Sequence, residues 1–552
     1  MHAPQLATAD PESRSMGRIK ALLSATALLT VMTVIVTWPQ ARYMSTRVAA
    51  HGDVFLSMWR LQWITHALST DVRHLFDGNI FFPHTRTLAY TDATLLEGLL
   101  AFPFLLTHAN PVLVYNVLLL GGIITSGVGM FLLARHLTGS ADAALVAAAI
   151  FTLAPYRIEH FMHLELQWTV WMPLALWGVH RIYESGAWRY GALTGAFLGL
   201  QLISCMYYGA FLGILVGALA VLLAIAQPRL VRAAAGPLLL GAALPAAVIF
   251  IYGQPYLANA RELGTRGPGE IAGFSAQLIS YVTAPEGNWL WGSTATRFHG
   301  EELRLLPGAT AAALALAAFF HRSRRMVWIY AALTALAFEL SLGFNGWLYR
   351  WLYGHIWVFE AFRAPARFAI LVCCALSVLA AFGVQYLQAR APGTRWRRTV
   401  LIAALVFVAV ESGSAPMRLL AVPRAVPDVY KVLKSLDRSV VIEFPIVDWD
   451  LTPFYMYWSA AHWDPLVNGY SGYRPADYAA TLDYMQTFPD DESIWRLREL
   501  HVRYILVHGF FYKPADYADL LLQAAQRPDL IPHGAFRDWA GQTQIFELKP
   551  AP

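Results

Sequence analysis

Long apolar stretches separated by short basic connections recur along most of this chain. A helix needs about 20 mostly apolar residues to cross the hydrocarbon core of a bilayer, and we count about eleven candidates, some of them short. They are residues 21–38, 111–133, 143–155, 167–179, 190–206, 209–226, 233–252, 305–320, 327–342, 368–387 and 399–410. Because 57% of the 552 residues are hydrophobic and only 14% are charged, too little polar surface is left for several soluble domains. The sequence therefore predicts a polytopic α-helical membrane protein.

Two stretches near the N-terminus need separate interpretation. The stretch 94–106 is too short for a span and contains Pro103, so we interpret it as a membrane-surface or re-entrant helix. The stretch 21–38 follows three basic residues but lacks a convincing small-residue cleavage site. We therefore expect it to be retained as a first helix.

The basic connections set the expected orientation, because Lys and Arg accumulate on the cytoplasmic side of a membrane. If residues 1–20 form a cytoplasmic N-terminus, the short Arg-rich connections all fall inside; a full span at 94–106 would export them. The transmembrane domain is then 21–415, and its long external loops are 39–111, 253–304 and 343–367. We expect a multi-pass protein of the bacterial inner (plasma) membrane.

The last segment, 416–552, has a different pattern. Short β-rich runs occur at 440–445, 502–507 and 544–548, with a helical stretch at 491–500 between them. This pattern predicts a small soluble α/β domain that is extracytoplasmic, periplasmic or extracellular.

Several function classes are not expected. The net charge of +5 comes from short clusters between apolar stretches, which orientation explains better than nucleic-acid binding does. Cys205, Cys373 and Cys374 lie inside apolar stretches, so we infer no disulfide and no thiolate metal site. The sequence contains no phosphate-binding Gly loop and no Gly-x-Ser-x-Gly elbow, so ATP-driven chemistry is not expected.

Asp53 is the first candidate for chemistry. It follows Gly52 in the first external loop, near Trp59 and Trp63. A carboxylate at a membrane surface can accept a proton from an acceptor hydroxyl as a general base. The alternative is a structural one, in which Asp53 is the N-cap of a helix that starts here.

The order of features in the first 250 residues resembles the GT-C superfamily. These features are one long first helix, the Gly52-Asp53 loop with surface helices, a helix ending in Ala134-Arg-His-Leu-Thr-Gly139, and Ala-rich sequence up to Leu153-Ala-Pro-Tyr156. The superfamily comprises polytopic glycosyltransferases that use polyprenyl-phosphate sugars, and it includes protein mannosyltransferases and arabinosyltransferases.

The resemblance implies that this chain is a hexosyl- or pentosyltransferase. A sugar on polyprenyl phosphate would react with an acceptor hydroxyl of a glycan, lipid or protein at the external membrane surface, with inversion. The family pattern assigns the catalytic base to Asp53. Since this chain has a single Asp after Gly52 rather than an adjacent acidic pair, Asp92 is the second candidate.

A second group of polar residues follows the stretch 143–155. It contains Glu159, His160, His163 and Glu165, and on one helix Glu159 and His163, four residues apart, would share a face. Imidazole and carboxylate suit a divalent metal such as Mg or Mn that would neutralise a leaving phosphate. Hydrogen bonding to sugar or phosphate, or a solvated helix start, are the alternatives.

Arg363 and Arg367 form the third group, just before the stretch 368–387. Four residues apart, they would lie on one side of a helix beginning near Pro365. Two guanidinium groups beside a helix N-terminus suit the phosphate of a lipid-linked donor. The alternative is contact with lipid headgroups, which any interfacial Arg can make.

Two other functions stay open on the sequence. Glu339 and Glu411, each near an external helix end, are the evidence for a transporter or flippase of lipid-linked saccharide. The third possibility is a non-catalytic membrane protein that binds envelope polymer. The aromatic run 468–473 suits carbohydrate, but its Asn-Gly and Ser-Gly pairs favour a plain turn.

Overall fold

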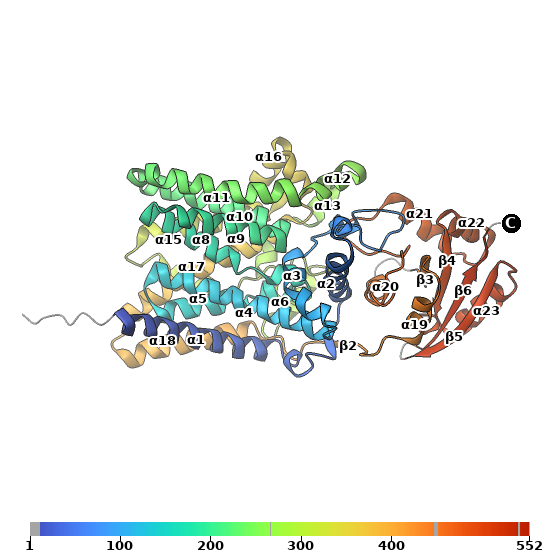
Figure 1. The fold of residues 1–552 in the computed structure, drawn as a ribbon. Coiled ribbons are helices and arrows are strands. Elements are labelled where there is room, and N and C mark those ends of the chain that lie inside the picture. The colour runs from blue at the N-terminus through green and yellow to red at the C-terminus, as the bar shows by residue number, and fades with distance from the viewer. Residues whose placement is uncertain (1–10, 265, 447–450, 539–540, 551–552) are drawn as a thin grey trace, which may run out of the picture.

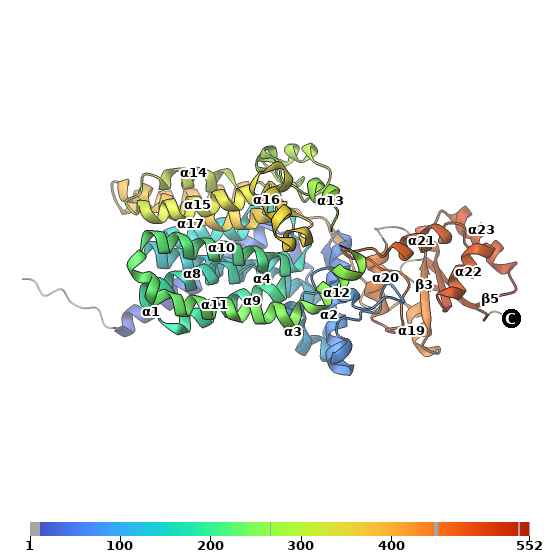
Figure 2. The ribbon, with the colours of Figure 1, turned by 90° about the horizontal axis from the view of Figure 1, so that it is seen from above.

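The molecule has two parts that lie end to end. The computed structural model describes residues 11–264, 266–446, 451–538 and 541–550. A bundle of long helices forms one part and a smaller part built around a β-sheet forms the other (Figures 1 and 2). The expected cytoplasmic N-terminus, 1–20, lies partly outside the described residues.

Each of the predicted apolar stretches forms a helix, as a chain in lipid must satisfy its backbone hydrogen bonds internally. The bundle helices are α1 (Pro11–Val36), α4 (Pro111–Thr138), α5 (Ala141–Leu153), α8 (Trp171–Ser185), α9 (Trp188–Ser204), α10 (Met206–Ala226), α11 (Val231–Tyr252), α14 (Ala309–Ala318), α15 (Arg324–Ser341), α17 (Ala369–Arg390) and α18 (Thr394–Glu411).

Within the described residues, six helical regions are long and apolar enough to cross a membrane. They are Ile19–Val36, Pro111–Thr138, Ala141–Glu159, Met206–Ala226, Pro228–Tyr252 and Pro365–Arg390. The chain is therefore a multi-pass membrane protein. α1 begins at the end of the bundle that lies away from the C-terminal part (Figure 1).

α17 is buried among its neighbours along most of its length and contacts α5, α14 and α15. A Cβ added to Gly383 would overlap the backbone carbonyl of Leu314 in α14. We expect Gly383→Ala to lower the free energy of unfolding by about 1–3 kcal/mol, because the two helices must move apart. Gly217→Ala is the matched control, since a Cβ there meets nothing within 4 Å. Equal thermal unfolding midpoints for the two variants in detergent would contradict this prediction.

Shorter helices lie between the long ones and near the junction of the two parts. They are α2 (Gly52–Thr70), α3 (Leu95–Leu106), α6 (Pro155–Glu159), α7 (Leu164–Gln167), α12 (Gln254–Leu263), α13 (Pro268–Gly273) and α16 (Leu348–His355). α3, the apolar stretch expected at the membrane surface, has 12 residues and exposes Leu99, Phe104 and Leu106. That length is short of a span.

The C-terminal part contains a four-stranded sheet in the order β3 (Val440–Phe444), β4 (Val502–His508), β6 (Gly541–Leu548) and β5 (Leu530–Asp538). β3 and β4 are parallel, and the other pairs are antiparallel. Its helices are α19 (Asp428–Ser435), α20 (Thr452–Ser459), α21 (Ala476–Met485), α22 (Asp491–Glu499) and α23 (Pro514–Ala525). The three predicted strands are confirmed. β5 was not predicted, because Pro532 and Gly534, where its register shifts, interrupt the strand pattern.

The first long loop and the C-terminal segment pack as one unit. β1 (Arg47–Ala49) pairs with β2 (Leu419–Ala421), and α2 packs on α20. Buried side chains of α2, the start of α4 and the sheet form one hydrophobic core. Residues far apart in sequence are thus held in a fixed relation at the end of the bundle.

Candidate active site

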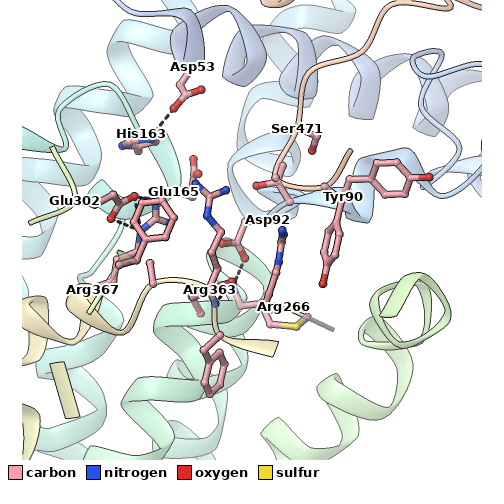
Figure 3. Close-up of a pocket in the computed structure, with 18 of the residues that line it drawn as sticks. Asp53, Tyr90, Asp92, His163, Glu165, Arg266, Glu302, Arg363, Arg367 and Ser471 are labelled. Carbon is pink, nitrogen blue, oxygen red and sulfur yellow. Dashed lines mark hydrogen bonds and ion pairs between the residues drawn. The ribbon is translucent and has the colours of Figure 1, made fainter. Parts of the chain in front are cut away.

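A cavity of about 490 Å³ lies where the bundle meets the C-terminal part. Side chains from the start of α2, the α6–α7 turn, the loop before α17 and the segment 470–473 face it (Figure 3). Six of the residues singled out from the sequence line it: Asp53, Asp92, His163, Glu165, Arg363 and Arg367. Glu159 and His160 are not among the described residues that line the cavity.

Asp53 lies in the first turn of α2. His51 is the N-cap, and its Nδ1 accepts the amide N–H of Asp53 over 3.1 Å. The alternative that Asp53 itself caps the helix is therefore wrong. Its carboxylate instead lies 2.7 Å from Nε2 of His163 and accepts a hydrogen bond from the hydroxyl of Tyr470 over 2.6 Å.

The charge state of Asp53 follows from these contacts. Burial alone would raise the pKa of Asp53, but the hydrogen bond and charge of His163 outweigh it and lower that pKa below its ordinary value. Burial would lower the pKa of His163, but the hydrogen bond and charge of Asp53 raise it overall. The two groups therefore stabilise each other as a carboxylate and an imidazolium.

The chain turns between Glu159 and Glu165 instead of continuing as a helix. α6 ends at Glu159, so the prediction that Glu159 and His163 share a helix face is wrong. Glu159 accepts a hydrogen bond from Arg304 over 2.8 Å, and Glu165 pairs with the buried Arg60 at 3.2 Å. The two carboxylates of this group are therefore each paired with a different arginine.

His160 is buried and has no partner on either ring nitrogen among the described residues. Its ring centre lies 5.6 Å from that of His163. Burial lowers the pKa of His160 to about 3, so this imidazole is neutral. No group of three or more His, Cys, Asp or Glu side chains in the described parts of the chain could hold a metal ion.

Asp92 supports the start of α10. Its carboxylate accepts the amide N–H of Met206 over 2.6 Å and contacts Sγ of Cys205 at 3.3 Å. Burial, with the charge of Glu165, raises the pKa of Asp92 to about 6. Asp92 therefore lines the cavity as a group that is already engaged with a helix N-terminus.

Three arginines give the cavity a positive wall. Arg367 forms a two-pronged ion pair with Glu302. Arg363 and Arg266 share one carboxylate, that of Glu270, at 3.3 and 3.4 Å. Three guanidinium groups against two carboxylates leave one positive charge without a carboxylate of its own among these five residues, and an anion can neutralise it.

The two predicted arginines do not lie on one helix. α17 begins at Ala369, and a 3₁₀ turn, Pro365–Phe368, precedes it. Arg363 therefore lies in the loop before that turn, where its guanidinium stacks on Phe274 at 4.6 Å. Both side chains still line the cavity.

Two further contributors to the cavity were not assigned to a site from the sequence. Arg266 stacks on Tyr473, with its guanidinium carbon 3.5 Å from the ring centre. The segment 470–473, interpreted as a plain turn, lines the cavity through Tyr470, Ser471 and Tyr473. Its aromatic content was the available signal, but nothing local connects this segment to Asp53.

Solved structures share this fold. AftD, an arabinofuranosyltransferase from Mycobacteria, superposes with a TM-score of 0.66 over 97% of this chain and 40% of its own, at 16% identity. ArnT from Cupriavidus metallidurans, bound to undecaprenyl phosphate, gives a TM-score of 0.52 over 97% and 99% of the two chains, at 11% identity. The Archaeoglobus fulgidus oligosaccharyltransferase gives 0.50 over 90% and 70%, at 12% identity.

This chain spans about two fifths of the length of AftD. No protein-family model and no curated protein matches the sequence. At these identities the likeness is one of fold, and it agrees with the resemblance in the first 250 residues. The chain therefore shares the fold of these solved structures.

Proposed function

We propose that this protein is an inverting membrane glycosyltransferase that moves a sugar from a polyprenyl-phosphate donor to an acceptor hydroxyl. The observation that carries the proposal is the shared cavity, in which an ionised carboxylate, Asp53, and the arginines Arg266, Arg363 and Arg367 line one space. A proton acceptor and an anion site are what direct displacement at a sugar carbon requires.

The proposed reaction uses these groups as follows. Asp53 accepts the proton of the acceptor hydroxyl while that oxygen bonds to the anomeric carbon. The bond from the anomeric carbon to the phosphate oxygen breaks, and the polyprenyl phosphate leaves with the bonding electrons. Arg363, Arg266 and Arg367 stabilise the charge that develops on the phosphate. Attack opposite the leaving group inverts the anomeric carbon.

Arg363 and Glu270 are expected to change donor binding in opposite directions. Arg363→Gln should raise the KM for the donor about 10-fold, because it removes a hydrogen bond to the charged phosphate. This value is at the low end of the range for such a bond, since the Arg363 side chain is partly exposed to solvent. Glu270→Gln should lower that KM, since it frees two arginines. Steady-state kinetics with varied donor measure both, and a KM that rises in both variants would argue against a phosphate site here.

The need for a divalent metal is a separate prediction from the proposed reaction. Mg²⁺ and Mn²⁺ prefer oxygen ligands, but arginines engage the carboxylates of Glu159 and Glu165, and His160 and His163 offer nitrogen. The four residues therefore fit such an ion poorly, and no step above depends on one. Loss of turnover in EDTA that Mg²⁺ or Mn²⁺ restores would establish the metal.

The contacts of Glu339 and Glu411 weaken the transporter alternative. Glu411 accepts the amide N–H of Thr310 over 3.0 Å at the start of α14. Glu339 accepts the amides of Trp347 and Leu348, over 2.7 and 3.1 Å, at the start of α16. Both carboxylates satisfy helix N-termini, so neither needs a transport role to explain it.

The finer topology belongs to this proposal. We propose eleven spans across a bacterial inner membrane, with residues 1–20 cytoplasmic and 21–415 transmembrane. The loops 39–111, 253–304 and 343–367 and the α/β domain 416–552 would lie on the periplasmic or extracellular side. The positions of α1 and the C-terminal part at opposite ends of the bundle support this scheme (Figure 1).

The test is transfer by the purified full-length protein in detergent. A panel of radiolabelled polyprenyl-phosphate sugars is incubated with envelope extracts as acceptors, with and without EDTA. We expect label to move from the lipid fraction to an acceptor for one class of donor. The absence of turnover for every donor by well-folded protein would overturn the proposal.

A further inference from the structure

Both oxygens of the Asp53 carboxylate are held by residues from distant parts of the chain. Oδ2 lies 2.7 Å from Nε2 of His163, and Oδ1 accepts a hydrogen bond from the hydroxyl of Tyr470 over 2.6 Å. Tyr470 belongs to the C-terminal part, 417 residues from Asp53. Burial raises the pKa of Tyr470, which keeps its hydroxyl protonated and able to donate.

The segment before Tyr470 is tied to the sheet on one side. The amide of Val467 donates to the carbonyl of Val441 in β3 over 2.9 Å. The side chain of Asn468 accepts the amide N–H of Glu443 and donates to its carbonyl, each over 2.8 Å. These backbone-directed contacts fix the segment along β3.

The first long loop holds the same segment from the other side. The amide of Leu466 donates to the carbonyl of Asn79 over 2.7 Å, and the amide of Phe82 donates to the carbonyl of Leu466 over 3.0 Å. Gly469 lies against the ring of Phe81 so closely that a Cβ would overlap it. Tyr470 therefore emerges from backbone that is fixed relative to both β3 and the loop.

We propose that Tyr470 is a positioning residue for the catalytic carboxylate, so that the C-terminal part completes the transfer site. The inference rests on the proposed function. A carboxylate bonded through both oxygens cannot rotate freely, and a general base acts efficiently only within hydrogen-bond reach of the proton that it takes. His163 and Tyr470 together hold Asp53 in one orientation beside the cavity.

A purely structural role does not require this hydroxyl. The β1–β2 pair, the packing of α2 on α20 and the backbone bonds of Leu466 already join the C-terminal part to the first loop. Removing one hydroxyl leaves all of these contacts. Its loss should therefore alter the orientation of Asp53 much more than the fold.

The test compares Tyr470→Phe with Tyr455→Phe in the full-length protein. Tyr455 is a buried tyrosine of the same part, whose hydroxyl donates to the carbonyl of Pro445 over 3.2 Å, away from the cavity lining. We expect Tyr470→Phe to lower kcat about 10- to 100-fold, the range for a hydrogen bond to a charged group. The KM for the polyprenyl-phosphate donor should stay within about twofold, and Tyr455→Phe should keep the wild-type kcat.

The outcomes separate the two proposals. If the wild-type protein turns over and Tyr470→Phe has the same kcat, only the positioning role is overturned. An equal loss of kcat and of thermal stability in both variants also overturns it, because it shows a structural effect. No turnover by the wild-type protein with any donor overturns the proposed function, and the positioning role with it.

Discussion

Replacing Asp53 with Asn is expected to lower kcat by about 10²- to 10⁴-fold, the usual contribution of a general base. Asn keeps the size of the side chain but cannot take up the proton of the acceptor hydroxyl. The KM for the donor should change little, since the arginines that line the cavity are untouched. Single-turnover transfer of label from a polyprenyl-phosphate sugar measures the chemical step directly.

Asp92→Asn decides which of the two acids is the base. An Asn oxygen can still accept the amide N–H of Met206, which Asp92 accepts over 2.6 Å, so the start of α10 should persist. We expect a much smaller loss than for Asp53→Asn. Asp428→Asn, which removes an exposed carboxylate paired with Lys431, controls for the loss of charge. A larger loss in Asp92→Asn than in Asp53→Asn would move the base to Asp92.

Arg367→Met is expected to lower the free energy of unfolding by about 3 kcal/mol, because it leaves the largely buried carboxylate of Glu302 without its counter-charge. Burial alone would raise the pKa of Glu302, but the charge of Arg367 lowers it overall. The contribution of this pair is therefore present above the ordinary pKa of a glutamate. It is lost only as the pH falls through the lowered value. The thermal unfolding midpoint in detergent near pH 7 measures the change.

Two further variants test that explanation. Arg367→Met combined with Glu302→Gln should recover most of the lost stability, since no unpaired charge remains. Arg503→Met removes a partly exposed arginine that pairs with Glu547 and Asp437, and it should cost at most about 1 kcal/mol. If the double variant is no more stable than Arg367→Met, an unpaired Glu302 is not the cause of the loss.

The positions of the helices were predictable because each depends on local sequence. About 20 apolar residues in lipid have few alternatives to a helix, and every predicted stretch forms one. The strands β3, β4 and β6 were predictable for a similar reason, because their β-branched and aromatic residues lie in short runs. β5 was missed where Pro532 and Gly534 break that pattern.

The partners of the site residues were not predictable in the same way. The sequence singled out Asp53, His163 and Arg363, and all three line one cavity. It did not indicate that Tyr470 would bond to Asp53 or that Arg266 would share Glu270 with Arg363. The bond between Tyr470 and Asp53 and the ion pair between Arg363 and Glu270 each join segments that are far apart in the sequence. Whether such segments meet depends on the whole fold.

The sequence by itself therefore determined the membrane class, the places of the helices and the residue types that can take up a proton or bind a phosphate. These properties follow from hydropathy and side-chain chemistry, which act over a few turns of chain. The tertiary structure decided which of those residues meet. Packing of the first loop against the C-terminal segment brings the hydroxyl of Tyr470 within 2.6 Å of Oδ1 of Asp53, although the two residues are 417 positions apart in the sequence. Long-range packing of that kind leaves no local signal in either segment.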